Sequence, residues 1–364
     1  MTGNSITVRS NTPFAGLYLV YKGSVANENE SNYGISHLME HLLFKNYNHL
    51  LSDFSQDGII SNAYTSDSEI VFYFQGLEEY LFQYENRILN LLNSFNTTQQ
   101  QLENEKQIVL QEYLNGFSVQ AEAHFANLFR TEFNYYGPIG KKECFMDIKL
   151  DDCYNYYDLQ FKQPDMIIYV SPNLPTNIPE LKLDSKELYL KREIGEPEII
   201  SSFEETRSVI FWKLIDSDNF KQIKLLSEIM GSGLESPIYQ TLREEHGLVY
   251  AVHTFTQRLN KDQSLICIMA EMHESNVSEF CLKLNETLKN AFSEKRFNVI
   301  KNSEKVRLKK AEILNYLDVQ KFISPEETIL LEDLDKFSYD DLMNIYEFDF
   351  KDFEVSIDGE INEN

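Results

Sequence analysis

Residues 34–44 read GISHLMEHLLF and place two histidines and a carboxylate within one short apolar segment. The spacing of the apolar residues predicts a helix over residues 36–45, on which His37 and His41 lie one turn apart on the same face. Two imidazoles in this arrangement can bind one metal ion. Glu40 lies on the adjoining part of that face, where its carboxylate can reach a water molecule at the metal. The segment therefore predicts a metal site with a general base beside it.

The spacing of these three residues is the H-x-x-E-H arrangement that inverted zinc peptidases carry on a helix. Given the histidine and glutamate content of the chain, this pattern arises by chance in about one sequence in a hundred of this length. The alternative interpretation is a pair of histidines on a helix surface beside a solvated carboxylate. The motif by itself favours metal-dependent hydrolysis over that alternative.

A third metal ligand has to come from another part of the chain, because a catalytic zinc usually keeps three protein ligands and one open position. The best candidates lie in a helix predicted over residues 98–114. Glu105 and Glu112 are seven residues apart there, which is two turns, so they share one face. One of them could bind zinc while the other orients a ligand from behind. The spacing does not decide which carboxylate has which role.

Length and composition predict two domains. The chain has 364 residues, of which 42% are apolar, so it can form about two domains with sizeable cores. The main shift in composition lies at residues 172–200, which carry four of the nine prolines. We place the boundary in this stretch. The predicted domains are residues 1–185, which would bind zinc, and residues 186–364, which would complete the substrate cavity.

The order of predicted elements is similar in the two halves: a strand, a helix, a hairpin and two helices. This repetition indicates an internal duplication. The predicted fold class is α+β, with two similar domains that each have an antiparallel sheet with helices packed on one face, a duplicated α/β roll. The strands are predicted at residues 16–21, 63–75 (a pair), 208–213, 248–256 and 263–272, and the helices at 36–45, 79–95, 98–114, 220–230, 236–245, 277–292 and 303–316.

Charge and hydropathy exclude several classes of function. The chain has 33 basic and 58 acidic residues, a net charge of −25, which argues against nucleic acid as a partner. No apolar run approaches the roughly 18 residues that span a bilayer, so no membrane partner is expected. The N-terminus has no pattern of a secretory signal, and the four cysteines form no CxxC pair. We therefore expect a cytoplasmic protein with reduced thiols.

Four blocks of the sequence, in order along the chain, carry a family resemblance. They are residues 34–45 with the H-x-x-E-H motif, SNAYTS at residues 61–66, the Glu105-x6-Glu112 pair, and Leu242-Arg243-x6-Tyr250 after the Gly-Ser-Gly of residues 231–233. Together they resemble the pitrilysin/insulinase family of zinc peptidases, in the short class that includes mitochondrial processing peptidase subunits. The chain is shorter than typical two-domain members and has only 14 glycines.

The resemblance implies a role for each matching residue. His37, His41 and Glu112 match the three ligands of one Zn²⁺ ion per chain. Glu40 matches the general base that activates water, and Glu105 matches the carboxylate that supports the ligands.

The resemblance also implies residues that handle the substrate. Arg243 and Tyr250 match a pair that completes the active site from the C-terminal domain. Asn62 and Ala63 match an edge strand that takes the substrate backbone, and Phe44 lies in the matching block beside it. An edge strand binds any peptide through main-chain hydrogen bonds.

These implications give a first hypothesis and an alternative. The first is a zinc metallo-endopeptidase that cleaves peptides or unfolded segments, with basic substrates weakly favoured by the acidic chain. The alternative is a non-catalytic subunit that binds peptides or assembles with a catalytic one. A metal-dependent hydrolase of another bond ranks last. By resemblance, the chain is expected to form a homodimer or a heterodimer with a homologous subunit.

Overall fold

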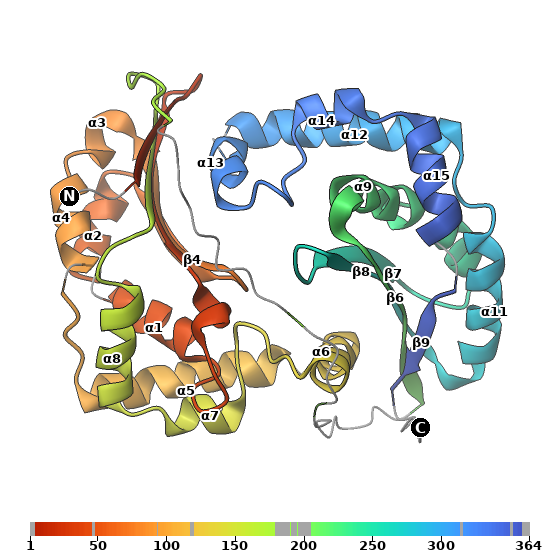
Figure 1. Ribbon diagram of the computed structural model, residues 1–364, viewed down its shortest axis with the longest axis horizontal. Coiled ribbons are helices and arrows are strands. Elements are labelled where there is room, and N and C mark those ends of the chain that lie inside the picture. Colours follow the sequence, from red (N-terminus) through yellow and green to blue (C-terminus); the bar gives the residue numbers. More distant parts are fainter. Residues whose placement is uncertain are drawn as a thin grey trace. The chain divides into compact units, whose positions relative to one another are not determined.

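The computed structural model describes residues 4–45, 48–92, 94–116, 120–178, 190, 195, 205–313, 316–349 and 352–358. Internal contacts divide the chain into two compact units (Figure 1). Unit 1 comprises Met1–Asn115, Tyr136–Tyr189 and Lys310–Ile323, and unit 2 comprises Gly116–Tyr135, Leu190–Lys309 and Ser324–Asn364. The predicted domain boundary at residues 185/186 lies outside the described residues.

Unit 1 is built on a five-stranded sheet in the order β1-β5-β2-β4-β3. Its strands are β1 (Asn4–Arg9), β2 (Phe14–Lys22), β3 (Ile60–Thr65), β4 (Glu69–Leu77) and β5 (Met166–Ser171). The pairs are antiparallel except that β1 runs parallel to β5. The strand β3 pairs with β4 and forms one edge of the sheet.

Unit 2 is built on a four-stranded antiparallel sheet in the order β7-β8-β6-β9. Its strands are β6 (Thr206–Asp216), β7 (Val252–Arg258), β8 (Gln263–His273) and β9 (Glu354–Ile357). This order repeats the order β3-β4-β2-β5 of unit 1 strand by strand. The prediction of an α+β fold with two similar, largely antiparallel units is therefore confirmed.

The helices fill the connections between these strands. In unit 1, the predicted helix over residues 79–95 is interrupted and forms two helices. In unit 2, the strand predicted over residues 248–256 begins only at Val252.

The α-helices outside the two discussed next are α1 (Ile35–Phe44), α2 (Asn48–Gln56), α3 (Glu78–Leu81), α4 (Glu85–Leu92), α5 (Gln99–Gly116), α7 (Lys142–Asp147), α8 (Leu150–Gln160), α9 (Phe220–Gly231), α10 (Pro237–Tyr239), α11 (Val277–Leu288), α12 (Glu294–Ile313), α14 (Leu331–Lys336) and α15 (Tyr339–Asp349).

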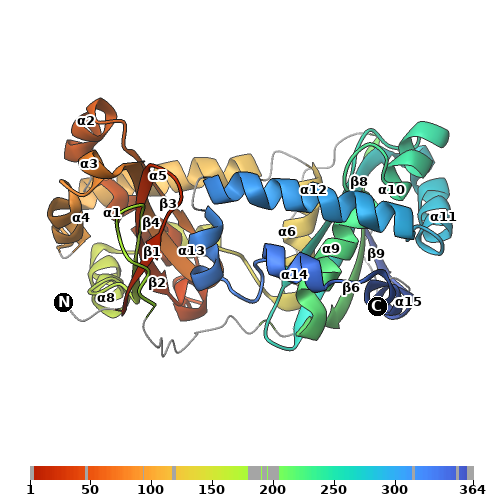
Figure 2. The ribbon, with the colours of Figure 1, turned by 90° about the horizontal axis from the view of Figure 1, so that it is seen from above.

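Both faces of the unit 1 sheet are covered, as two neighbouring residues of one strand show. Neighbouring residues of a strand point to opposite faces. On β2, the Tyr21 ring packs against Phe161, directly after α8. Val20 points the other way, into a core cluster that includes Val319 and Ile323 of α13 (Tyr316–Ile323). Figure 2 shows α13 beside β1 and β2. The helix α13 comes from the C-terminal half of the chain.

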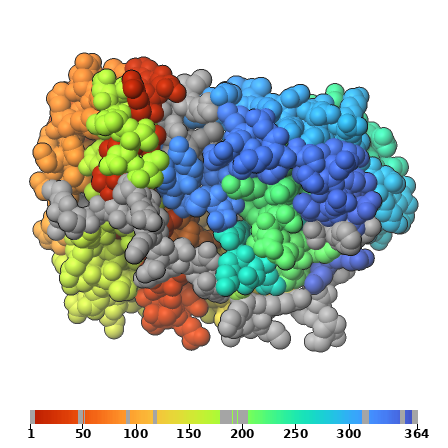
Figure 3. All heavy atoms as spheres, turned by 45° about the horizontal axis from the view of Figure 1, so that its top comes forward, coloured from red at the N-terminus to blue at the C-terminus, as the bar shows by residue number. Residues whose placement is uncertain are grey.

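Unit 2 shows the converse arrangement. On β6, the Phe211 ring contacts Phe280 of α11, and Trp212 points to the other face, where its ring contacts Phe133 of α6 (Gln120–Phe133). The helix α6 comes from the N-terminal half of the chain. Each sheet thus has a helix on its second face from the other half, which the prediction of helices on one face did not include. Figure 3 shows residues of the C-terminal part of the chain in blue at the surface, and these include α14 and α15 of unit 2.

None of the helices in the described part of the chain combines the length and the apolar composition needed to cross a bilayer.

The start of α1 packs against a turn at residues 137–140. Gly34 and Gly140 both have positive φ angles, 96° and 77°. A Cβ atom on Gly140 would lie 2.4 Å from both the Cα and the nitrogen of Gly34. Only glycine allows this approach, so it fixes where the histidine helix begins.

We expect Gly140→Ala to destabilise unit 1 by about 2–5 kcal/mol, from the left-handed backbone and the clash together. Gly137→Ala is the matched control, because Gly137 also has a positive φ of 64° but an added Cβ atom would meet nothing within 4 Å. It should cost only about 1–2 kcal/mol. Urea unfolding followed by circular dichroism measures both. Equal losses of stability would contradict the close approach.

A buried histidine links α6 to the unit 2 sheet. The two ring nitrogens of His124 each lie 2.9 Å from a serine hydroxyl, on Ser208 and on Ser356. Burial lowers the pKa of His124 from 6.5 to about 4. Between these values the unfolded chain takes up a proton that the folded chain does not, so the stability contributed by neutral His124 is lost as pH falls from 6.5 towards 4.

We expect the free energy of unfolding contributed by His124 to fall by about 2 kcal/mol between pH 7 and pH 5. The difference in stability between wild type and His124→Gln should therefore shrink by this amount. Fluorescence of Trp212, the single tryptophan, reports unfolding of unit 2. His253→Gln, at an exposed position on β7, should show no such change. A pH-independent difference for His124→Gln would contradict a buried neutral imidazole.

Candidate metal centre

The helix α1 is tied to the preceding loop at its first turn. It begins after Gly34, and the Glu28 carboxylate accepts hydrogen bonds from the backbone N–H groups of Gly34 and Ser36, each at 2.9 Å. The Ser36 hydroxyl is 2.7 Å from that of Tyr156 on α8. Burial raises the pKa of Glu28 to about 7. These contacts fix the helix start and hence the direction of its histidines.

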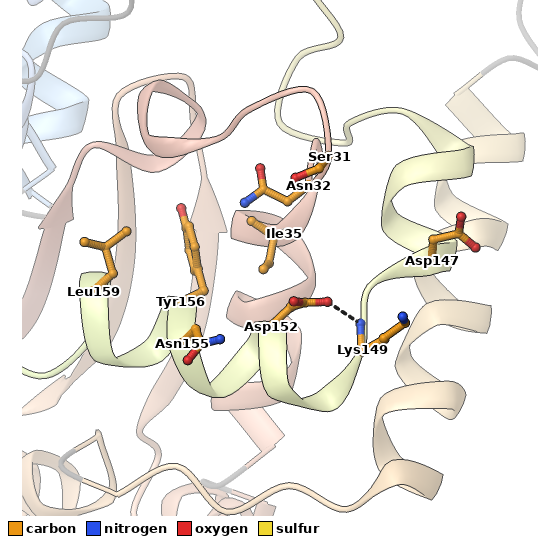
Figure 4. Close-up of a pocket in the computed structure, with 9 residues that line it drawn as sticks. All are labelled: Ser31, Asn32, Ile35, Asp147, Lys149, Asp152, Asn155, Tyr156 and Leu159. Carbon is orange, nitrogen blue, oxygen red and sulfur yellow. Dashed lines mark hydrogen bonds between the residues drawn. The ribbon is translucent and has the colours of Figure 1, made fainter.

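A cavity of about 550 Å³ lies beside this helix start, between the loop before α1 and the α7–α8 segment (Figure 4). Its floor includes Ile35 and Tyr156, and Asp152 accepts a hydrogen bond from the Lys149 backbone at its rim. Taken over the described residues, its lining includes none of the predicted site residues. The predicted chemistry therefore lies elsewhere on α1.

Three potential ligand atoms converge between α1 and α5. The Nε2 atoms of His37 and His41 are 3.2 Å apart. Oε2 of Glu112 lies 3.4 Å from Nε2 of His37 and 3.5 Å from Nε2 of His41. A tetrahedral zinc ion with bonds of about 2.0–2.1 Å needs ligand atoms about 3.3–3.4 Å apart. The three atoms therefore fit zinc both in chemical type and in spacing.

His37 is suited to bind a metal at neutral pH. Burial and the neighbouring His41 lower the pKa of His37 to about 4, so its imidazole is neutral at pH 7 and keeps a free lone pair. The side chains of His37 and His41 are 16% and 17% exposed, whereas that of Glu112 is 45% exposed. The ligand set is thus largely enclosed, with its carboxylate at the solvent side.

Glu40 lies next to this ligand set. Potential ligand atoms of His37, Glu40 and His41 all lie within 4.8 Å of one another. Burial raises the pKa of Glu40, which brings a carboxylate closer to the range in which it works as a general base near neutral pH. The Thr65 hydroxyl on β3 donates a hydrogen bond to Oε2 of Glu40 at 3.2 Å. Glu40 is therefore held by the sheet edge as well as by α1.

Glu105 lies on the other side of His41. Its Oε2 is 3.4 Å from Nδ1 of His41, and its carboxylate is only 3% exposed. Its Oε1 forms an ion pair with Nζ of Lys45. The spacing alone left the roles of Glu105 and Glu112 open, and the resemblance assigned Glu112 to the metal. In the structure Oε2 of Glu112 lies near both Nε2 atoms, whereas Oε2 of Glu105 lies near Nδ1 of His41.

The predicted substrate residues of unit 1 lie close by in the fold. Asn62 and Ala63 are on the edge strand β3, and the Ala63 N–H donates to the Asn62 side chain at 2.9 Å. Phe44 is the last residue of α1 and is half-buried. Their part in substrate binding stays a prediction.

Arg243 and Tyr250 belong to unit 2. Arg243 lies in a short π-helix, η4 (Gln240–Glu245), a feature that is frequent at functional sites. Its guanidinium donates to the Tyr250 carbonyl at 2.6 Å and lies over the rings of Tyr250 and Tyr239, 4.6 Å and 5.0 Å from their centroids. Tyr250 is 82% exposed, so its side chain is accessible rather than packed in a strand.

Two contacts of the site were not predicted from the sequence. Lys45 is four residues after His41, one further turn along the same helix face, and this spacing is a signal that could have found it. Thr65 is three residues after Asn62 on β3. Its hydroxyl could be placed only once the strand was packed beside α1.

Comparison with known proteins agrees with this description. Residues 6–136 match the family model described as "Insulinase (Peptidase family M16)", and residues 186–304 match "Peptidase M16 inactive domain". A relative from Rickettsia felis, described as "Uncharacterized zinc protease", is 22% identical over an alignment 380 positions long, which covers 94% of this chain and 92% of the relative.

Solved structures show the same fold. A protease from Helicobacter pylori superposes with a TM-score of 0.74 at 17% identity, over 97% of this chain and 95% of that one. A structure from Pseudomonas fluorescens, described as a peptidase M16 inactive domain, has a TM-score of 0.70 at 13% identity, over 97% and 93% of the two chains. The two family models together cover most of the sequence, and the chain belongs to the pitrilysin/insulinase family, peptidase family M16.

Proposed function

We propose that this protein is a zinc metallo-endopeptidase that hydrolyses peptides or unfolded polypeptide segments. The observation that carries the proposal is the convergence of two imidazole nitrogens and the Glu112 carboxylate within 3.5 Å, with Glu40 beside them. The zinc protease name of the Rickettsia felis relative supports the metal. Membership of the peptidase family supports the reaction class.

His37, His41 and Glu112 would hold the zinc ion. When bound, zinc supplies Lewis acidity that makes water a nucleophile at neutral pH. Glu40 accepts the proton of the attacking water and returns it to the leaving amine. The hydrogen bond from Thr65 keeps the Glu40 carboxylate in place through both transfers.

The edge of β3 would bind the substrate as an added strand, through main-chain hydrogen bonds along that edge. Thr65 lies on the same strand and contacts Glu40, so substrate binding and the general base share one element. In the second unit, Tyr250 would donate a hydrogen bond to the developing oxyanion, and Arg243 would hold the tyrosine and the peptide.

We propose further that the chain works as a dimer in which Arg243 and Tyr250 of one protomer serve the zinc site of the other. Both the zinc residues and the Arg243–Tyr250 pair occur in this one sequence. A homodimer would therefore be complete without a second gene product.

The alternative is a non-catalytic peptide-binding subunit. The match to an inactive-domain model gives it some support, but that match covers residues 186–304, outside the zinc residues. A pure binding protein has no use for a carboxylate held beside a ligand set. The two functions differ in what they require. A peptidase needs the Glu40 carboxylate for cleavage, whereas a binding subunit needs only the surface around it.

We expect Glu40→Gln to reduce peptide cleavage by about 10²–10⁴-fold, because the amide cannot accept a proton, while zinc content stays at the wild-type level. Mass-spectrometric cleavage of a mixed peptide library, with and without a chelator, measures the loss. Glu103→Gln is the control, since Glu103 is a half-exposed carboxylate on the same helix as Glu105.

The mechanism would be overturned if Glu40→Gln cleaved peptides at the wild-type rate. It would also be overturned if the wild-type protein kept its activity in the presence of the chelator. Peptide binding without any cleavage by the wild type would favour the non-catalytic alternative.

Arg243→Ala should lower kcat/KM by about 10²–10³-fold. A heterodimer of Glu40→Gln and Arg243→Ala subunits, co-expressed and purified through two different tags, should recover about half of the wild-type activity. One of its two sites then combines an intact Glu40 with an intact partner Arg243. A heterodimer as inactive as its parents would show that the pair does not act across subunits.

A further inference from the structure

We propose that Lys45 is a positioning residue of the metal centre: its ammonium group holds the Glu105 carboxylate against His41 and thereby raises the affinity for zinc. The inference rests on the proposed zinc site. It assigns a role to a residue that contacts neither the metal ligand atoms nor the general base.

Lys45 is placed for this role by the helix itself. It is the C-cap residue of α1, and its backbone N–H donates to the carbonyls of His41 and Leu43. Because it lies four residues after His41, its side chain leaves the helix one turn further along the same face. The ammonium reaches Oε1 of Glu105 on α5. One helix thus supplies both the imidazole and the cation that meet at this carboxylate.

Glu105 needs a cationic partner because it is almost fully enclosed. Its side chain is 3% exposed, and an unpaired charge at such a depth is strongly destabilising. Among the described residues, Glu105 makes ionic contacts with His41 through Oε2 and with Lys45 through Oε1. Lys106 is next in sequence but points elsewhere, to Glu103 and the Met146 carbonyl. The buried carboxylate therefore depends on Lys45 for its charge balance and its position.

The position of Glu105 in turn determines how His41 presents its lone pair. A carboxylate at Nδ1 keeps the proton on that nitrogen and leaves Nε2 free for the metal, and such a partner also raises the basicity of the ring. Nδ1 of His37 is buried and, within the described part of the chain, has no hydrogen-bond partner. Orientation of the histidine pair thus depends mainly on the Lys45–Glu105–His41 chain of contacts.

The test measures zinc affinity of the full-length protein by competition with a chromogenic chelator. Loss of a supporting contact behind a metal ligand typically weakens binding about 10–100-fold, and we expect this loss for Lys45→Met. Lys45→Arg keeps the positive charge and should stay within about threefold of wild type. Lys45→Gln is a milder variant in case Lys45→Met folds poorly.

Lys22→Met is the matched control. Lys22 also pairs with a buried glutamate of unit 1, Glu69, at 3.4 Å, but this pair lies on β2 and β4. Its loss should lower thermal stability without changing zinc affinity. A second test asks whether Lys45 acts through Glu105: in a Glu105→Gln background, adding Lys45→Met should change zinc affinity by less than about twofold.

The outcomes separate the two proposals. If the wild type does not bind zinc, both the proposed function and this inference fail. If the wild type binds zinc tightly and Lys45→Met and Lys45→Gln bind it equally well, only the role of Lys45 is overturned. The same holds if Lys45→Met weakens binding to the same extent with and without the Glu105 carboxylate.

Discussion

Nε2 of His37 and Nε2 of His41 are held 3.2 Å apart, a spacing that two nitrogen lone pairs tolerate only with a cation or a proton between them. Much of unit 1 serves to maintain it. Gly34 and Gly140 let the start of α1 approach a neighbouring turn, and Glu28 binds the first N–H groups of the helix. At the far end of the helix, the contacts of Glu105 hold the second ring. The geometry is therefore pre-organised by the fold rather than assembled by the ligand.

The sequence was sufficient to predict the parts of the site that depend on local geometry. The four-residue spacing of His37 and His41 requires only that α1 be a helix. The seven-residue spacing of Glu105 and Glu112 likewise requires only α5. The choice between these two carboxylates could not be made from spacing, because it depends on how α5 is rotated against α1. That rotation is set by packing between segments about sixty residues apart in the chain.

Other features depended on long-range pairing and were missed for that reason. The parallel pairing of β1 with β5 joins residues 4–9 to residues 166–171, and nothing in either strand indicates its partner. Tyr250 occurs in an apolar stretch that favours a strand, but the chain turns there before β7 begins at Val252. The edge position of β3 followed from resemblance, and the sheet order shows it directly.

The helices α6 and α13 each pack on the sheet of the opposite half of the chain, and this arrangement suggests how the duplicated chain arose. Each follows the long helix that ends the repeated series of elements, α5 in the first half and α12 in the second, so the two occupy equivalent places. Each packs on the sheet of the opposite half. A half-sized ancestor in which each of two identical copies packed this helix on the sheet of the other would have been a domain-swapped dimer. Joining two such copies end to end gives the present topology. Neither half of the chain then covers the second face of its own sheet without a helix from the other half.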